Sequence, residues 1–190
     1  MMKKAAVFVF GLVFLAAGCG DDPRFFGDDR MSGGTDGGSS GQCGGASDDT
    51  TPLDAEEQRF LDLLNQHRAN NGAPPVTACT SLNRAAQRHS EDMRDQNYFD
   101  HTGLDGSSPG DRACDACFES CGSGGFGENI AAGNTDAAAT FEQWRNSPGH
   151  NNNMLRESYV VVGIGRATGG GSYRAYWTNV FSTTADPSCN

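Results

Sequence analysis

The sequence predicts a domain of the α+β class, and three observations support this expectation. Amphipathic helical patterns come first, over residues 55–70 and 82–96. The C-terminal part contains two runs rich in β-branched and aromatic residues, and Gly169-Gly170-Gly171 between them is typical of a hairpin turn. Helices followed by a run of strands favour an α+β sandwich over a parallel sheet.

The first helix is predicted over residues 55–70. Asp54 and Glu57 have the spacing of a capping box, and Asn71-Gly72 is typical of a left-handed helix end. Three apolar residues and one histidine recur at helical intervals and define a buried face, which comprises Phe60, Leu63, Leu64 and His67.

Further helices are predicted from similar start signals. The second runs over residues 82–96, with Ser81 as its N-cap. A third begins after Thr135, and Ser147-Pro148 has the N-cap and first-turn pattern of a separate short helix that ends near Leu155.

Strands are predicted over residues 159–165 and 172–181, paired as a hairpin, and over residues 128–131. The large aromatic side chains near these elements are expected to pack in the core or on the sheet rather than to line a ligand groove. They are Trp144, Tyr173, Tyr176 and Trp177.

Residues 1–18 are typical of a lipoprotein signal peptide. Lys3 and Lys4 form its basic start, and the apolar run Ala5–Ala17 is too short to span a bilayer as an ordinary helix. Small residues directly before Cys19 resemble a bacterial lipobox, which predicts cleavage there and acylation of this cysteine. The alternative is a plain secretory signal, which would leave the protein secreted.

Residues 19–52 predict a flexible tether, because their many Gly, Ser and Asp residues bury too little apolar surface to offset the entropy of ordering. Residues 53–190 fit one domain of ordinary size. The chain has 14 basic and 24 acidic residues, a formal charge of −10, which argues against nucleic acid as a partner. The expected location is therefore the cell envelope, with a membrane as partner through the acyl anchor.

Seven cysteines are present. Apart from Cys19 an even number remains, which in an exported chain predicts three disulfides. The spacing does not choose among their pairings, and the cysteines concerned are Cys43, Cys79, Cys114, Cys117, Cys121 and Cys189. A thiolate metal site in the closely spaced group around Cys117 is the alternative, and oxidising conditions disfavour it.

Several short strings together resemble the CAP superfamily, also called SCP domains, of cysteine-rich secretory proteins, antigen 5 and pathogenesis-related proteins. They occur in the expected order, and the resemblance covers nearly all of residues 56–182. The strings are Leu64-Asn65-Gln66-His67-Arg68, Ala86-Gln87-Arg88-His89, Phe99-Asp100-His101-Thr102-Gly103, Gly127-Glu128-Asn129-Ile130, Trp144-Arg145-Asn146-Ser147-Pro148-Gly149-His150 and Tyr176-Trp177-Thr178-Asn179-Val180-Phe181.

The resemblance implies a three-layer α-β-α sandwich with a central antiparallel sheet, and a cleft holding two histidines and two acidic residues. By position in the motifs, His101, Glu128 and His150 match three of the four. The second acid falls on Ser147, which departs from the pattern, and Glu142 is the substitute candidate.

Two neutral imidazoles can coordinate zinc or another divalent cation, so His101 and His150 are the candidate metal ligands. Glu128 would orient one of them or accept a bridging water. The structural alternative leaves these side chains as hydrogen-bonding partners that pin loops and helices. His67 and His89 lie at apolar helical spacings and are interpreted as packed structural residues.

Three functions are compatible with this pattern. The first is a tethered binding domain whose cleft holds a lipid, peptide or glycan. The second is a metal-assisted hydrolase acting on envelope protein or peptidoglycan, with Glu128 as candidate general base. The third is a structural or interaction protein with a vestigial cleft. Binding is favoured over catalysis, because no activated nucleophile is expected and the second acid is missing.

Overall fold

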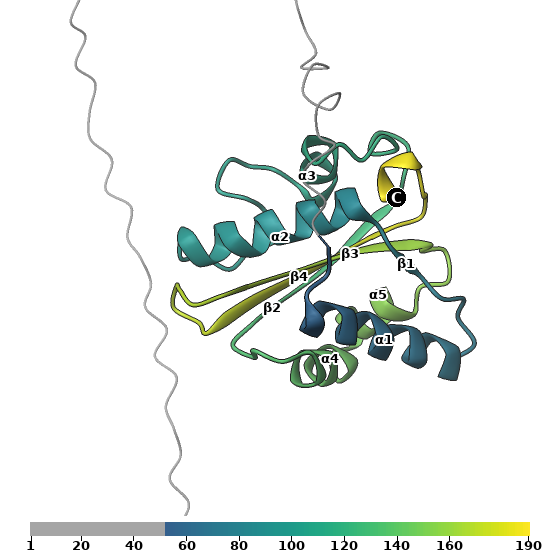
Figure 1. Cartoon of the computed structure of the whole chain (residues 1–190), viewed down its shortest axis with the longest axis horizontal. Coiled ribbons are helices and arrows are strands. Elements are labelled where there is room, and N and C mark those ends of the chain that lie inside the picture. Colours follow the sequence, from purple (N-terminus) through teal and green to yellow (C-terminus); the bar gives the residue numbers. More distant parts are fainter. Residues whose placement is uncertain (1–51) are drawn as a thin grey trace, which may run out of the picture. The chain divides into compact units, whose positions relative to one another are not determined.

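The computed structural model describes residues 52–190, which form helices on both faces of one four-stranded sheet (Figure 1). One face carries α2 (Thr80–Asp95) and α3 (Pro109–Asp115). The other face carries α1 (Ala55–Asn70), α4 (Ala137–Arg145) and α5 (Pro148–Leu155). The expected α-β-α sandwich is therefore confirmed. The predicted signal peptide and nearly all of the predicted tether, with Cys19 and Cys43, lie outside the described residues.

The sheet is mixed rather than fully antiparallel, which corrects the expectation from the sequence. Its order is β1-β3-β4-β2, and its strands are β1 (Thr77–Ala78), β2 (Phe126–Ala132), β3 (Val161–Thr168) and β4 (Ala175–Ser182). β3 and β4 form the predicted antiparallel hairpin, but the short β1 pairs in parallel with β3. Parallel neighbours need a long connection, and here the whole chain from α2 to α5 separates them.

The capping box at the start of α1 is present as predicted. Asp54 accepts hydrogen bonds from the backbone N–H groups of Glu56 and Glu57, and the Glu57 carboxylate accepts one from the N–H of Asp54. Gly72 ends the turn after the helix with a φ of +77°. Phe60 and Leu64 are buried as predicted, whereas Leu63 and His67 of the predicted face are only half-buried. The buried side chains also include the cap residue Glu57 and the fully buried Arg68.

α2 begins two residues before the predicted start, and Ser81 is not its N-cap. Cys79 occupies the N-cap position and makes no side-chain cap bond. The Ser81 hydroxyl is buried and lies 2.8 Å from the Ser188 hydroxyl, near the disulfide between Cys79 and Cys189. Long-range contacts therefore place this helix end, in preference to the local capping preference.

α2 packs directly on β3 because two glycines leave room for it. A Cβ atom at Gly163 would collide with the carbonyl group of Leu82, and one at Gly165 would collide with the backbone nitrogen of Gln87. Any larger residue would push the helix off the sheet. This close packing fixes the position of α2 on the sheet, and with it the start of the loop that follows the helix.

The main core lies between the sheet and α1, and its large side chains include Phe60, Leu64, Trp144, Trp177 and Phe181. Trp144, Trp177 and Tyr176 are buried, as predicted. The prediction for Tyr173 is wrong, because β4 begins only at Ala175 and leaves Tyr173 in the hairpin turn, 48% exposed.

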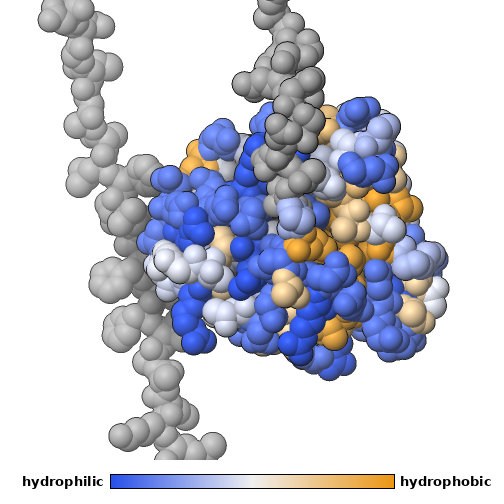
Figure 2. Space-filling model, in the orientation of Figure 1, coloured by the Kyte–Doolittle hydropathy of each residue, from blue (hydrophilic) through white to orange (hydrophobic). Residues whose placement is uncertain are grey.

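Disulfides close two segments of the described domain. Cys79 pairs with Cys189, and Cys114 pairs with Cys121. Cys117 is also disulfide-bonded, so the close cysteine group is oxidised and does not form a thiolate metal site. Within residues 52–190, none of the helices has the length and apolarity needed to cross a bilayer. The face in Figure 2 is mostly hydrophilic, with apolar residues gathered toward the right of the view.

Candidate functional site

Glu128 lies near the middle of β2, the strand at one edge of the sheet, and its side chain is only 2% exposed. His101 donates from Nδ1 to Oε1 of this carboxylate at 2.8 Å, and Arg112 donates from Nη2 to Oε2 at 2.6 Å. A buried carboxylate needs such partners to offset lost hydration. Both oxygens of Glu128 are thus engaged by basic side chains.

Arg112 was not suggested by the sequence, and it holds the loop that carries His101. Its guanidinium donates to the carbonyl oxygens of Ser107 at 2.8 Å and of His101 at 3.0 Å. Arg112 projects from α3, a helix that was also not predicted. The signal was present, since Ser108 forms a capping box with Asp111 and Pro109 occupies the first turn.

His150 approaches from the opposite layer, on α5. Its Nδ1 lies 2.9 Å from the Ser147 hydroxyl, and its backbone carbonyl accepts a hydrogen bond from the Asn129 side chain at 3.1 Å. Ser147 occupies the predicted N-cap position of α5, but its side chain makes no cap bond. Ser147 therefore orients His150 rather than the helix end.

His101 and His150 line the same hollow at the edge of the sheet. Its volume is about 380 Å³, and its lining residues are Phe99, Asp100, His101, Ile130, Gln143 and His150. Glu128 lies behind His101 and is not part of the lining. The structure therefore brings together three candidates that lie far apart in the sequence.

The two imidazoles titrate in opposite directions. The hydrogen bond that His101 donates to Glu128 raises the pKa of His101, although partial burial opposes it. Burial lowers the pKa of His150, and the positive charge of a protonated His101 lowers it further. At a pH between the two pKa values, the hollow is lined by a positively charged His101 and a neutral His150.

The structure does not bring Glu142 to this hollow. Its carboxylate is 2.6 Å from the guanidinium of Arg145, and it lines a different hollow beside His67 and Phe141. The next residue, Gln143, lines the histidine hollow instead. Successive helical residues point about 100° apart, which places Gln143, an amide, where a second acid was sought.

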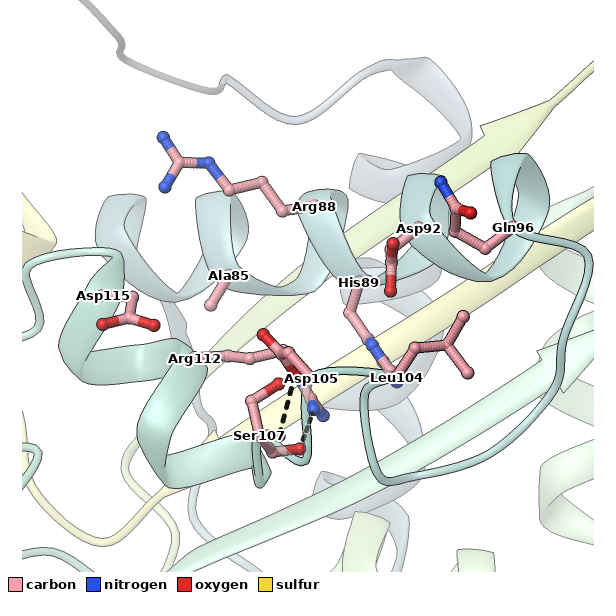
Figure 3. A pocket seen from close by; sticks show the side chains of 10 residues that line it. All are labelled: Ala85, Arg88, His89, Asp92, Gln96, Leu104, Asp105, Ser107, Arg112 and Asp115. Atoms are coloured by element: carbon pink, nitrogen blue, oxygen red, sulfur yellow. Dashed lines mark hydrogen bonds between the residues drawn. The ribbon is translucent and has the colours of Figure 1, made fainter. Parts of the chain in front are cut away.

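A second hollow lies on the other side of the His101 loop, between α2 and α3 (Figure 3). Its volume is about 430 Å³, and Arg112, Asp105 and Ser107 lie close together on its wall. His89 also lines it and donates from Nε2 to the carbonyl oxygen of Asp100 at 3.1 Å. His89 is buried, as predicted, and its hydrogen bond to the backbone of Asp100 helps to hold the loop that carries His101.

The sequence contains one motif that is typical of a serine nucleophile, although no activated nucleophile is expected. Residues 106–110 have the Gly-x-Ser-x-Gly spacing, with Ser108 at its centre. This serine follows a loop rather than a strand, and its hydroxyl is 2.6 Å from the carboxylate of Asp111 as part of the capping box. It lacks the strand–turn–helix context of a nucleophile elbow.

The histidine hollow offers a metal ion one ring nitrogen from each of two histidines. Nδ1 of His101 and Nδ1 of His150 are both hydrogen-bonded, which leaves Nε2 of each ring for a ligand. The described domain contains no group of three or more His, Cys, Asp or Glu side chains placed to hold a metal ion. The residues therefore fit a two-histidine site and not a closed structural zinc site.

The model of the Cysteine-rich secretory protein family, CAP, matches residues 61–181. The chain belongs to the CAP family. This confirms the resemblance inferred from the sequence motifs.

Two relatives from Bacillus subtilis are similar to this domain. The chain is 30% identical over 131 residues to the uncharacterised protein YkwD of Bacillus subtilis, covering 68% of this chain and 48% of that protein. It is 34% identical over 109 residues to the uncharacterised membrane protein YlbC of the same organism, covering 57% of this chain and 31% of that protein. The chain thus spans about half or less of these relatives.

Solved structures agree with the fold. An extracellular protein containing an SCP domain from Bacillus anthracis has a TM-score of 0.57 and 30% identity, covering 68% of this chain and 44% of that one. An outer surface protein from Borrelia burgdorferi has a TM-score of 0.59 at 17% identity, covering 68% of this chain and 95% of that one, and shows a shared fold.

Proposed function

We propose that this CAP protein works outside the cytoplasm, anchored to a membrane through acyl chains on Cys19, and that its histidine hollow binds a ligand there. Disulfides among the described cysteines support an oxidising compartment. The extracellular SCP-domain protein of Bacillus anthracis supports the same location. The convergence of His101 and His150 on one hollow carries the binding part of the proposal.

The geometry supports binding better than hydrolysis. A general base must accept a proton from water, but both oxygens of Glu128 already accept hydrogen bonds from His101 and Arg112. The candidate second acid, Glu142, pairs with Arg145 outside the hollow. The candidate ligands are a lipid, a peptide and a glycan.

A divalent cation such as zinc would be held by Nε2 of His101 and of His150, and it would supply a Lewis-acid site for an oxygen atom of a ligand. Calorimetric titration of the purified chain with zinc tests this step. We expect the double variant His101→Ala/His150→Ala to bind at least tenfold more weakly than the parent, and His67→Ala to match the parent. Equal affinity in the double variant would show that the cation site is elsewhere or absent.

Mass spectrometry of protein purified from membranes tests the anchor and the ligand together. We expect an acylated N-terminal Cys19, and a co-purifying molecule that the double histidine variant loses. A mature chain that begins without acyl groups would contradict the anchor. A ligand retained equally by the double variant would contradict its placement in the hollow.

A further inference from the structure

Two exposed aromatic rings stand at the margin of the histidine hollow. Phe99 is 44% exposed and Tyr173 is 48% exposed, and their ring centroids lie 6.3 Å apart. Tyr173 also packs edge-on against Tyr176, with centroids 5.7 Å apart. Phe99 itself lines the hollow, so the aromatic surface continues into it. The two neighbouring rings thus offer an aromatic surface that a ligand in the hollow could contact.

The two loops that carry these rings are fixed to each other. Asn97, with a φ of +56°, accepts hydrogen bonds at its side-chain oxygen from the backbone N–H of Ser172 at 2.7 Å and from the Ser172 hydroxyl at 2.6 Å. Gly171 allows this approach, since a Cβ there would lie 2.8 Å from the carbonyl oxygen of Arg94. The ring pair is therefore preorganised, which lowers the entropy cost of binding.

We infer that the ring pair and the histidine hollow together bind an uncharged glycan, with one sugar on the face of Phe99 and Tyr173 and the next in the hollow. This inference rests on the proposed binding function and names its ligand class. A sugar ring has an apolar C–H face, which suits an aromatic ring, and a hydroxyl edge, which suits imidazole, amide and carboxylate groups. Asp100, Gln143 and His150 supply these groups in the hollow.

The hydrogen bonds along the outer edge of β2 argue against a peptide that binds as an additional strand of the sheet. Strand addition requires free backbone groups along β2, the edge strand. The carbonyl oxygen of Glu128 already accepts from the Asn153 side chain, and that of Ile130 accepts from Nε1 of Trp144, both at 3.1 Å. Both acceptors are occupied where a peptide strand would pair.

Charge and polarity argue against the other ligands. An acyl chain in the hollow would place its methylene groups beside four polar side chains, which cannot hydrogen-bond to it, namely Asp100, His101, Gln143 and His150. A polyanionic glycan would meet a chain with a formal charge of −10 and the carboxylate of Asp100 in the hollow. An uncharged oligosaccharide meets neither obstacle.

The test uses hexamers of β-1,4-linked N-acetylglucosamine and of β-1,4-linked glucose, titrated into the purified chain and followed by calorimetry and NMR. We expect at least one hexamer to bind, and Phe99→Ala and Tyr173→Ala each to weaken it about tenfold or more. Leu104→Ala is the matched control, because Leu104 is 67% exposed yet lies on the other hollow. Circular dichroism verifies that each variant is folded.

The outcomes separate this inference from the proposed function. Binding that both ring variants leave unchanged overturns the ring platform. If neither hexamer binds while oleate or an extended peptide does, and His150→Ala abolishes that binding, the glycan is overturned and the binding function stands. If none of these probes binds, the glycan inference is overturned, and the ligand retained on natively purified protein decides the binding function separately.

Discussion

The segments that carry His101 and His150 are each held by an arginine, but the two arginines lie in different surroundings. On the His150 side, the fully buried Arg68 donates to the carbonyl oxygens of Met154, Arg156 and Tyr159, at the end of α5 and just beyond it. On the His101 side, Arg112 is 11% exposed and divides its guanidinium between loop carbonyls and Glu128.

Because of this difference, the support of His150 does not depend on pH, whereas the support of His101 depends on the protonation of its own ring. His150 rests on a helix pinned through neutral carbonyls, whereas His101 rests on a loop whose arginine shares a carboxylate with the imidazole itself. Protonation of His101 therefore strengthens its own anchorage. Because the folded state raises the pKa of His101, its contribution to stability is present below pH 6.5 and is lost as the pH rises through the folded pKa.

The largest expected effect is on the His150 side. Arg68→Met removes donors from four carbonyl oxygens, including that of Pro74, and we expect it to cost about 3–5 kcal/mol of unfolding free energy. Denaturant unfolding measures this cost. Arg59→Met, at an exposed position of the same helix, is the matched control, and we expect it to stay within about 0.5 kcal/mol of the parent. If both variants lose the same unfolding free energy, the buried hydrogen bonds of Arg68 do not hold the segment that carries His150.

The next effect is on the His101 side. Arg112→Met leaves the buried Glu128 with His101 as its remaining basic partner, and we expect a cost of about 2–3 kcal/mol, since one carboxylate oxygen loses its donor. The positive charge of Arg112 lowers the pKa of His101 in the parent, so this pKa should rise further in the variant. NMR titration of the imidazoles measures the rise. Arg145→Met, at an exposed pair on α4, should leave both the stability and this pKa unchanged.

Glu128→Gln sharpens the comparison by removing the carboxylate alone. We expect the pKa of His101 to fall, because the largest influence that raises it is the hydrogen bond that its ring donates to Glu128. The stability of the variant should also lose its dependence on the protonation of His101 near neutral pH. Unfolding experiments at pH 5.5 and pH 8 compare the two chains. An unchanged His101 midpoint would show that the carboxylate does not support this ring.

The smallest effect is expected at Ser147→Ala. The hydroxyl orients His150 but makes no cap bond, so we expect a loss of unfolding free energy below about 1 kcal/mol. The free energy of binding zinc or a ligand should decrease by more than the free energy of unfolding does, because the imidazole of His150 samples other orientations once it has lost this hydrogen bond. A destabilisation of about 2 kcal/mol or more would mean that Ser147 caps α5 after all.

The sequence predicted what short-range interactions determine. The bounds of α1 and α5 match, because the capping box at Asp54 and the proline at position 148 act within one turn. The start of α2 did not match, because the disulfide to Cys189 and the contact with Ser188 come from the other end of the domain. Long-range constraints of this kind leave no local signal.

The candidate site was partly predictable for the same reason. Its histidines and Glu128 stand in recognisable motifs, but Arg112 contributes only because α3 happens to lie over the β2 edge. Glu142 was one residue away from the position that faces the hollow, which Gln143 occupies. The exposure of Tyr173 depends on where the hairpin stops pairing, and a run of alternating residues does not reveal that point.

The shared hollow is tested most directly by an NMR pH titration of His150 in the parent and in His101→Gln. The account predicts that His150 titrates below pH 6.5 in the parent and that its midpoint rises in the variant, because the positive charge of the neighbouring ring has been removed. A midpoint that is identical in both chains would contradict the account, since the two imidazoles would then not face one another.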